Sequence, residues 1–335
     1  MKNKILFIET GGHTIHRRLM KEIGADIIYI PDGEIPFYLP KYSLYIVEGS
    51  YIIASLIKRR VKKNAKVITL FCDPRLFYLK INKQFNKEKN RIENCSWLRR
   101  IIAEYSFKNL DGAICFGKFL TELLKEKYYM NGIPIRTIYG FIEEERYKQL
   151  LKIKPNLSER NIVFIGDGPD YYCKGLDLVI ECFREAKKSI PELRLDILGE
   201  WKIKNEKGFI KEGIHFQGRV DIVPYLKKAS LSLHLGRGEA FGINVAECML
   251  SGIPTIVSEY TGAKEIVPKE FISSLNKKEI IEKIVNYMNL DLGKKKEISK
   301  EIRKPSKKFT EKESIRIFKN AIGELENERQ NNIPI

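Results

Sequence analysis

The sequence predicts an α/β protein built from two doubly wound, Rossmann-like domains, and three observations support this fold class. Its 335 residues are enough for two such domains of ordinary size. Short apolar runs of strand length alternate with segments of helical periodicity, the order that produces parallel sheets. A polar stretch with a proline, residues 152–160, interrupts this pattern and indicates a linker. We therefore expect an N-terminal domain over 1–151, a C-terminal domain over 161–305, and a last helix with a frayed tail over 306–335.

The first domain opens with the apolar strand KILFIE, a turn at Gly11 and Gly12, a short helix and the strand ADIIYIP. Glycines at the carboxyl end of a parallel strand let a ligand approach the backbone closely. Strand and helix patterns alternate again over 43–73, and NLDGAICFGKFLTELLKEKY predicts the last large strand-turn-helix unit. We therefore expect a parallel sheet with a glycine loop at its ligand-binding edge.

The second domain begins with the strand NIVFIGDG, and Lys174 with Gly175 opens a helix whose apolar residues keep helical spacing. LRLDILGE predicts the next strand, and GIHFQGRVDIVPYLKKA predicts another strand, a turn at Gly218 and the start of a helix. Helical periodicity returns over 277–289 and over 308–328, on either side of a basic stretch. These elements again suit a parallel sheet.

One stretch of this domain, residues 232–267, carries the strongest chemical signal. A buried strand is expected to end in the loop GRGE, after which apolar residues recur at helical spacing until Gly252 and Pro254 stop the helix. A second strand follows at once, which completes a βαβ unit. Glu239 then lies on the loop at the carboxyl end of the first strand, where ligands of parallel sheets bind, and Glu247 lies on the helix. The first amides of that helix can donate to anions or oxygens.

The strings EAFGINVAE, SGIPTIVS and TGAKEIV together resemble the signature of the retaining GT-B glycosyltransferases with a group 1 C-terminal domain, the family with the E-x7-E motif. The resemblance covers residues 161–267 well, whereas the first domain is similar in pattern only. It implies two Rossmann-like domains facing a cleft, with a last helix that can cross back to the first domain. It also implies that Glu239 and the amides of Phe241 and Gly242 meet the donor sugar, and that Glu247 holds the ribose.

The same resemblance assigns further contacts to a nucleotide-sugar donor. A glycine-rich loop in the first domain approaches the diphosphate, a lysine in the second domain neutralises it, and residues after a glycine turn contact the base. By position these are Gly11 and Gly12 with the neighbouring His13, then Lys174, and then Gly218, Arg219 and Val220.

Two positions depart from the family pattern. Many relatives carry a histidine near the donor sugar where this chain has Cys72 and Asp73, so Asp73 is a candidate catalytic contact, with capping of the next turn as the alternative. Relatives also place an arginine after the first strand of the second domain, where this chain has Asp167. A carboxylate there repels a diphosphate unless another cation compensates, and Arg219 and Arg237 are the nearest candidates.

The implied reaction is transfer of a hexose-type sugar from a nucleotide-sugar to an acceptor hydroxyl, with retention of anomeric configuration. The protein would act by positioning and electrostatics. No cofactor is expected, and no metal is required, because no D-x-D motif occurs and Lys174 can neutralise the diphosphate. The six cysteines and four histidines show no metal-ligand spacing either.

Charge and hydropathy bear on partners and location. The net charge is +17, and residues 1–150 hold 27 Lys and Arg against 16 Asp and Glu. Basic residues are in excess over 58–63 and 97–110, and the second of these segments is amphipathic. This pattern fits an anionic membrane surface and a lipid-linked or glycan acceptor. The alternative is a set of solvated basic faces without a partner. The first apolar run is too short for a signal peptide or a membrane span, so we expect a cytoplasmic protein, peripheral on the inner membrane face.

Alternative functions remain open at this point. A GT-B protein that binds a nucleotide-sugar without transferring it would explain Asp167 and the missing histidine. A basic protein that binds nucleic acid or another anionic surface is allowed by the charge, but Lys and Arg are not interleaved with aromatic residues in a recognisable module, and we expect no nucleic-acid partner. A sugar epimerase or phosphorylase of the same architecture is a further possibility. The base, the sugar, the acceptor and the oligomeric state are not encoded in any motif of this chain.

Overall fold

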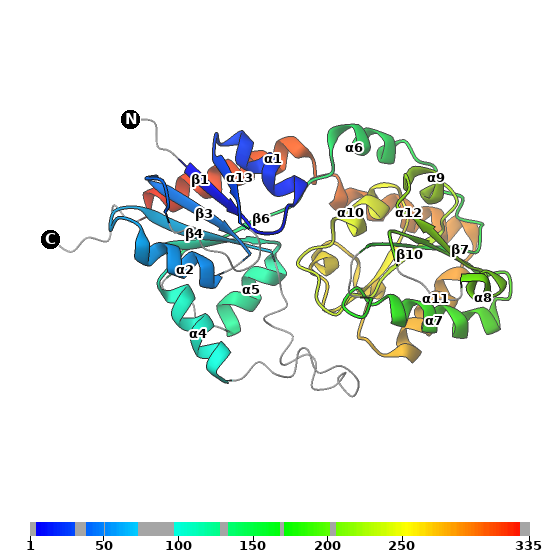
Figure 1. The fold of residues 1–335 in the computed structure, drawn as a ribbon. Helices are drawn as coiled ribbons and strands as arrows, with labels where there is room; N and C mark the ends of the chain where they lie inside the picture. Colours follow the sequence, from blue (N-terminus) through cyan, green and yellow to red (C-terminus); the bar gives the residue numbers. More distant parts are fainter. Residues whose placement is uncertain are drawn as a thin grey trace. The chain divides into compact units, whose positions relative to one another are not determined.

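The computed structural model describes residues 5–30, 38–49, 51–72, 97–127, 133–167, 171–201 and 206–328. The chain divides into two compact units (Figure 1). The first unit contains residues 1–140 and 312–335, and the second contains residues 141–311. The chain therefore passes between the units twice. The first passage falls before the helix α6 (Glu144–Leu151), which contacts α10 (Ile243–Leu250) and so belongs to the second unit.

The first unit is a parallel sheet with helices on both faces (Figure 1). Its six strands have the order β2-β1-β3-β4-β5-β6, so the chain reverses its direction across the sheet between β1 and β3. Three of the strands are buried along their whole length, because helices on both faces exclude water from them. The strands are β1 (Ile5–Glu9), β2 (Asp26–Tyr29), β3 (Leu44–Glu48), β4 (Lys66–Phe71), β5 (Gly112–Phe116) and β6 (Ile135–Ile138), and the helices are α1 (Thr14–Glu22), α2 (Tyr51–Arg60), α4 (Trp97–Lys108), α5 (Lys118–Lys127) and α13 (Glu311–Asn327).

The last helix, α13, packs on this first sheet although it follows the second unit in the sequence. Lys66 at the start of β4 donates through Nζ to the carbonyl oxygens of Leu325 (2.9 Å) and Glu326. Arg136 on β6 forms an ion pair with Glu324 at 2.5 Å. The Leu325 side chain is buried. The C-terminal helix thus completes the first unit.

The second unit is another six-stranded parallel sheet, of order β12-β11-β10-β7-β8-β9. The reversal lies between β7 and β10. Helices α7, α8 and α11 lie on one side of this sheet, and α10 and α12 lie on the other (Figure 1). The strands are β7 (Asn161–Ile165), β8 (Arg194–Leu198), β9 (Ile214–Gly218), β10 (Leu231–His234), β11 (Thr255–Ser258) and β12 (Ile272–Ser273), and the helices not yet given are α7 (Leu176–Ser189), α8 (Glu206–Lys211), α9 (Val223–Leu226), α11 (Lys277–Met288) and α12 (Leu292–Ser306).

The basic stretch between the two helices expected near the C-terminus is itself a helix, α12, with Pro305 near its end. Its lysines obscure the apolar period in the sequence. Arg303 on this helix donates to the carbonyl oxygens of Leu250 (2.7 Å) and Ser251 (2.6 Å), the last residues around α10. Helix ends leave such carbonyls without partners in the helix, so Arg303 caps α10 from outside. A side chain at Gly252 would meet Arg303 at 2.6 Å, which accounts for the glycine there.

Candidate functional site

The carboxyl ends of β7 and β10 form the switch point of the second sheet, where ligands of doubly wound folds bind. Close backbone packing shapes the loop after β10. Gly262 lies so near this loop that a Cβ atom would come within 1.9 Å of the Ala240 carbonyl oxygen. The Gly262 amide donates to the carbonyl of Glu239 at 2.9 Å, and the Glu239 amide donates to that of Tyr260 at 3.2 Å. The backbone of Glu239 is therefore held from both sides.

Lys174 and Glu239, which lie 65 residues apart, meet at this point. The Lys174 Nζ atom is 2.5 Å from Glu239 Oε2. Gly175, with φ of 72°, begins α7 and lets the chain pass so close to the β10 loop that a Cβ atom would be 2.0 Å from the Leu235 carbonyl oxygen. Burial lowers the pKa of Lys174, but the Glu239 carboxylate more than offsets this, so its pKa lies above the usual value. Lys174 is therefore a fixed cation at the switch point.

His234, the last residue of β10, lies close enough to this pair for both charges to affect its pKa. Its side chain is fully enclosed, and burial lowers its pKa to about 4, so the imidazole is neutral at physiological pH. The Asn244 amide nitrogen lies 3.3 Å from His234 Nδ1, which makes Nδ1 the acceptor and places the proton on Nε2. Asn244 also donates to the Ile165 carbonyl at the end of β7. His234 and Asn244 therefore link β10, α10 and β7, and His234 is packed rather than exposed to solvent.

Asp167, which stands where an arginine was expected, is paired with Arg219. The Arg219 Nη2 atom is 2.6 Å from Asp167 Oδ2, and its Nε atom donates to the same oxygen at 3.2 Å. The Arg219 side chain is exposed, and the Asp167 carboxylate raises its pKa. The negative charge of Asp167 is therefore compensated at the end of β7 by a residue from the loop after β9.

Arg237, the other candidate for this compensation, has a different place. It forms a bidentate ion pair with Asp177, in which Nη1 and Nη2 donate to the two carboxylate oxygens at 2.7 and 2.9 Å. Its guanidinium lies 3.8 Å from the centre of the Tyr172 ring. Its side chain is buried, so Arg237 braces the start of α7 and leaves Asp167 to Arg219.

Glu247 lies one turn into α10 with a carboxylate that receives no hydrogen bond from any described residue. Burial raises its pKa to about 7, and of the nearby charges Arg146 lowers the pKa while Glu143 raises it. A half-buried carboxylate without donors is costly in the free protein. It offers acceptors to a ligand with hydroxyl groups.

The remaining expected donor contacts are backbone positions. Phe241 is buried and packs against the ring of Phe309 at a centroid distance of 5.0 Å, so only its backbone is placed for a ligand. Gly242, with φ of 86°, precedes α10. Gly218, with φ of 70°, ends β9 and has open space around its Cα. The structure therefore brings Lys174 and Glu239 into direct contact and places the other residues on the loops that follow β9 and β10.

The carboxyl end of the first sheet is built differently, around Glu48 at the end of β3. The Glu48 carboxylate accepts hydrogen bonds from the amides of Thr10 (2.8 Å) and Gly11 (2.6 Å), and its other oxygen contacts the Nδ1 atom of His16. Burial raises the pKa of Glu48, but these hydrogen bonds outweigh it, so the pKa lies below the usual value. Glu48 therefore fixes the glycine loop that contains Gly11 and Gly12. The sequence places Glu48 and Gly49 at a strand end, but no pattern in it assigned an anchoring role to Glu48.

His13, His16 and Glu48 are the group in the described residues whose ligand atoms lie close enough for a metal ion, all within 4.8 Å of one another. Both oxygens of Glu48 already accept hydrogen bonds within the protein. The carboxylate accepts three hydrogen bonds in all, so Glu48 and His16 already anchor the glycine loop.

Asp73 lies outside the described residues, and Cys72 next to it is half-buried at the end of β4. Asp73 as a catalytic contact thus stays a prediction.

No helix in the described part of the chain combines the length and hydropathy needed to cross a membrane.

Comparisons with known proteins give this geometry a context. Residues 145–308 match the family model of glycosyl transferases group 1. The lipopolysaccharide glucosyltransferase WaaG of Escherichia coli is 26% identical over 122 residues, which are 34% of this chain and 33% of that protein. The chain therefore matches about one third of this curated relative.

Solved structures show the same fold at low sequence identity. The sucrose-phosphate synthase of Thermosynechococcus elongatus has a TM-score of 0.70 at 15% identity, covering 98% of this chain and 99% of that one. HepE of Anabaena, solved with UDP and glucose, has a TM-score of 0.64 at 16% identity, covering 97% and 99%. TarM of Staphylococcus aureus, solved with UDP, has a TM-score of 0.60 at 17% identity, covering 85% of this chain and 55% of that one. The prediction of two parallel-sheet α/β domains of the GT-B type is confirmed.

Proposed function

We propose that this protein is a glycosyltransferase that transfers a sugar from a nucleotide-sugar donor to an acceptor hydroxyl with retention of anomeric configuration. The observation that carries the proposal is the contact between Lys174 and Glu239 at the switch point of the second sheet. Both residues lie within the segment that matches group 1 glycosyl transferases. The likeness to structures solved with UDP supports a nucleotide-bearing donor.

Each side chain has a role that follows from its charge and place. Lys174 neutralises the diphosphate, and the charge that develops on the leaving nucleotide strengthens this contact as the glycosidic bond breaks. On donor binding, Glu239 turns from Lys174 to the hydroxyls of the donor sugar. Glu247 accepts hydrogen bonds from the ribose hydroxyls, which supply the donors that its carboxylate lacks in the free protein. The loop at Gly218 and Arg219 faces the base, and Arg219 keeps Asp167 from repelling the diphosphate.

The reaction needs no nucleophile from the protein. The bond between the anomeric carbon and the diphosphate oxygen breaks, and the acceptor oxygen forms its bond to the same carbon on the same face. The acceptor proton passes to the leaving phosphate oxygen, which balances the step. Lys174 and the fixed backbone of Glu239 then contribute by holding charge and orientation. Lys174 takes the place of a divalent cation, so we expect EDTA to leave donor binding unchanged.

The experiment that tests this proposal is donor turnover with a panel of UDP-, GDP- and ADP-sugars, followed by NMR. We expect one donor class to be hydrolysed slowly to nucleoside diphosphate, with the sugar released in the configuration of the donor. Glu239→Gln should lower this rate at least tenfold while diphosphate binding persists. Release of the opposite anomer would overturn retention. Tight donor binding with no turnover would favour a protein that only binds the nucleotide-sugar.

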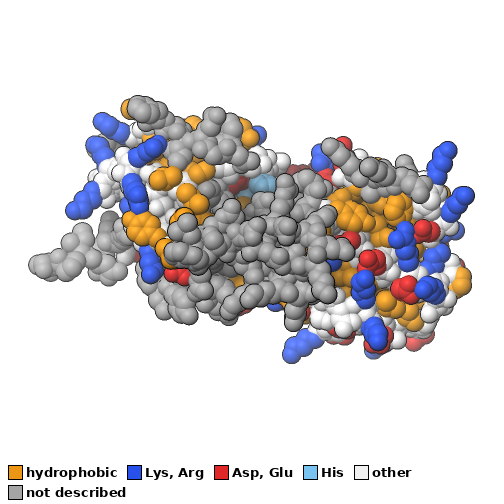
Figure 2. All heavy atoms as spheres, turned by 60° about the horizontal axis from the view of Figure 1, so that its bottom comes forward, with side chains coloured by type: hydrophobic (Ala, Val, Ile, Leu, Met, Phe, Trp, Pro, Cys, Tyr) orange, Lys and Arg blue, Asp and Glu red, His pale blue; other side chains and the backbone are white. Residues whose placement is uncertain are grey.

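A basic and apolar surface of the first unit supports an anionic membrane as the location of a lipid-linked or glycan acceptor. Ile101, Ile102 and Tyr105 on α4 are each at least 39% exposed, and the Arg59 guanidinium lies 5.1 Å from the centre of the Tyr105 ring. Arg60, Lys62 and Lys63 are also exposed. Hydrophobic side chains lie among Lys and Arg side chains on this face (Figure 2). Lys58 belongs to the same basic run, but its Nζ atom is paired with Asp111 at 2.6 Å, so we do not count it as part of this surface.

Vesicle sedimentation tests this membrane surface. We expect binding to vesicles with phosphatidylglycerol and much weaker binding to vesicles of phosphatidylcholine alone, because each basic residue near an anionic surface contributes about 1 kcal/mol. Exchanging Ile101 and Ile102 for serine should weaken binding, whereas Ile210→Ser, at a residue of the second unit with 49% exposure, should not. Equal binding to both kinds of vesicle would show that the basic residues do not contribute to membrane binding.

A further inference from the structure

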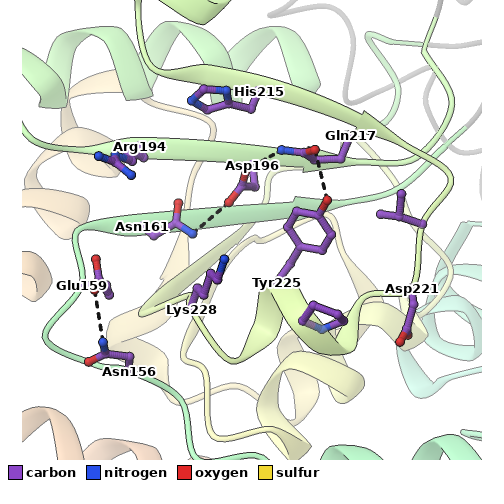
Figure 3. A pocket seen from close by; sticks show the side chains of 12 residues that line it. Asn156, Glu159, Asn161, Arg194, Asp196, His215, Gln217, Asp221, Tyr225 and Lys228 are labelled. Carbon is purple, nitrogen blue, oxygen red and sulfur yellow. Dashed lines mark hydrogen bonds between the residues drawn. The ribbon is translucent and has the colours of Figure 1, made fainter.

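A cavity of about 890 Å³ lies on one face of the second sheet at its β7-β8-β9 edge (Figure 3). Parallel sheets in doubly wound folds are normally covered on both faces. On one face here, Leu195, Ile197 and Ile214 are fully buried. The other face carries polar residues, since Asn161 pairs in register with Arg194, and Asp196 with His215.

The cavity exists because the connection from β9 to β10 is short. Its helix, α9, has four residues, one turn, and cannot cover the neighbouring strands. Tyr225 from this turn and Asn156 from the 152–160 stretch form the walls. The volume is in the range of small-molecule sites. Lys174, Glu239 and Glu247 do not line it, whereas Val220, which the family resemblance places near the donor base, does. The cavity therefore adjoins the proposed donor site without sharing its charged residues.

A hydrogen-bond network forms its floor (Figure 3). Asp196 accepts hydrogen bonds from Asn161 Nδ2 and Gln217 Nε2, both at 2.9 Å. The Tyr225 hydroxyl donates to Gln217 Oε1 at 3.1 Å, which fixes the orientation of that amide. A carboxylate offers about four acceptor positions, so about two remain on Asp196 for a ligand.

A second observation is that one buried acceptor at this floor lacks a hydrogen-bond donor. Asn161 is 7% exposed, and its Oδ1 atom has no hydrogen-bond partner in the described structure. A buried acceptor without a partner costs about 1–3 kcal/mol. Rotation of the Asn161 side chain toward the cavity would break its hydrogen bond to Asp196 and bring Oδ1 to a ligand hydroxyl. Asp196 would then accept from a neighbouring hydroxyl. Adjacent acceptors of this kind suit vicinal hydroxyl groups.

The charge at the centre of the cavity selects against an anion. Three carboxylates line the cavity, from Glu159, Asp196 and Asp221, together with the cations of Arg194 and Lys228, and Arg146 lies 3.7 Å from Asp221. The central group, Asp196, is held by neutral amides rather than by a cation. A phosphate or a nucleotide would meet this carboxylate directly, whereas an uncharged polyhydroxylated ligand would not be repelled.

We propose that this cavity is a second binding site, for a neutral sugar residue of a glycan, with Asp196 and Asn161 as hydroxyl acceptors and Tyr225 as the wall against which the ring packs. The site does not depend on the proposed transferase activity. In a glycosyltransferase it would hold a glycan away from the place of transfer.

Saturation-transfer NMR on the full-length chain tests the site with glucose, galactose, N-acetylglucosamine, maltose and cellobiose as probes. We expect at least one of them to bind, with at least tenfold weaker binding to Asp196→Asn and a smaller loss for Tyr225→Phe. Glu185→Gln, which alters an exposed acid on α7, is the matched control and should bind as the wild type does. Unchanged melting temperatures of the variants show that they fold.

Addition of UDP, GDP or ADP separates this site from the donor site. We expect no displacement of the saccharide. Displacement would assign the signal to the donor site and overturn the proposal, as would the absence of binding by every saccharide, equal binding to Asp196→Asn, or binding of inorganic phosphate in place of sugars. Saccharide binding that persists in a protein without nucleotide affinity would support this site while the proposed transferase function fails.

Discussion

Two glutamates, Glu48 in the first unit and Glu247 in the second, lie near the carboxyl ends of parallel sheets in opposite electrostatic states. Glu48 is 1% exposed, yet its pKa is lowered, because two backbone amides and His16 hydrogen-bond to it. Glu247 receives no such hydrogen bond from the described residues, and burial raises its pKa to about 7. The difference teaches that burial alone does not identify a ligand-binding carboxylate. What distinguishes the two is whether the protein already supplies the donors.

The largest expected effect concerns stability. Glu48→Ala leaves the amides of Thr10 and Gly11 and the His16 ring without their acceptor, so it should lower the free energy of unfolding by about 3 kcal/mol. Glu247→Ala should cost less than about 1 kcal/mol, because no hydrogen bond is lost. Urea unfolding of both variants measures this. Equal losses of unfolding free energy in the two variants would show that the hydrogen bonds to Glu48 do not stabilise the protein.

The second effect concerns nucleotide binding and its pH dependence. Glu247→Gln should weaken nucleoside diphosphate binding by about tenfold or more, since hydrogen bonds to charged groups are worth about 1.5–3 kcal/mol. In the wild type, affinity should rise as the pH increases through about 7, where Glu247 ionises, and the variant should show a flatter profile. Isothermal titration calorimetry at pH 6 and 8 measures both. A profile shared by wild type and variant would remove Glu247 from the site.

The two glutamates should also affect stability with opposite signs. The pKa of Glu48 is below its unfolded value in the native state, so its contribution is present above that value, near 4.5, and is lost as the pH falls through the lowered pKa. The pKa of Glu247 is raised from 4.5 to about 7, so the folded state loses stability as the pH rises between these values. Glu247→Gln should therefore reduce the loss between pH 5 and 7. The difference in melting temperature between variant and wild type across this range is the measurement, and a constant difference would contradict it.

The smallest effect is expected at Arg219. This side chain is 76% exposed, so its ion pair with Asp167 should contribute little to stability. Arg219→Ala should nevertheless weaken diphosphate binding several-fold, because it leaves Asp167 uncompensated. The double change Arg219→Ala with Asp167→Ala should restore part of the affinity. If the double variant bound the diphosphate no better than Arg219→Ala, Asp167 would not be close enough to the diphosphate to repel it.

The fold was accessible from the sequence because strands and helices alternate with clear periods. The strand expected directly after Gly252 and Pro254 agrees with β11, Thr255–Ser258. The helix α12 was missed because lysines interrupt its apolar pattern. The family resemblance also implied that Lys174 and Glu239 both contact the donor. It could not predict that Arg219 rather than Arg237 compensates Asp167, since that depends on how the loops after β7 and β9 approach each other. The anchoring role of Glu48 likewise arises from contacts 37 and 38 residues apart along the chain.

The central claim is that the second unit binds a nucleoside diphosphate through Lys174. A thermal-shift comparison of UDP, GDP, ADP and the corresponding nucleosides, on wild type and on Lys174→Ala, tests it most directly. We predict that one diphosphate raises the melting temperature of the wild type, since a ligand at ~100 times its dissociation constant adds about 2.7 kcal/mol to stability. The same diphosphate should lose most of its effect on Lys174→Ala, while the effect of the nucleoside is kept. A wild type that responds to none of the diphosphates, or a variant that responds equally, would contradict the account.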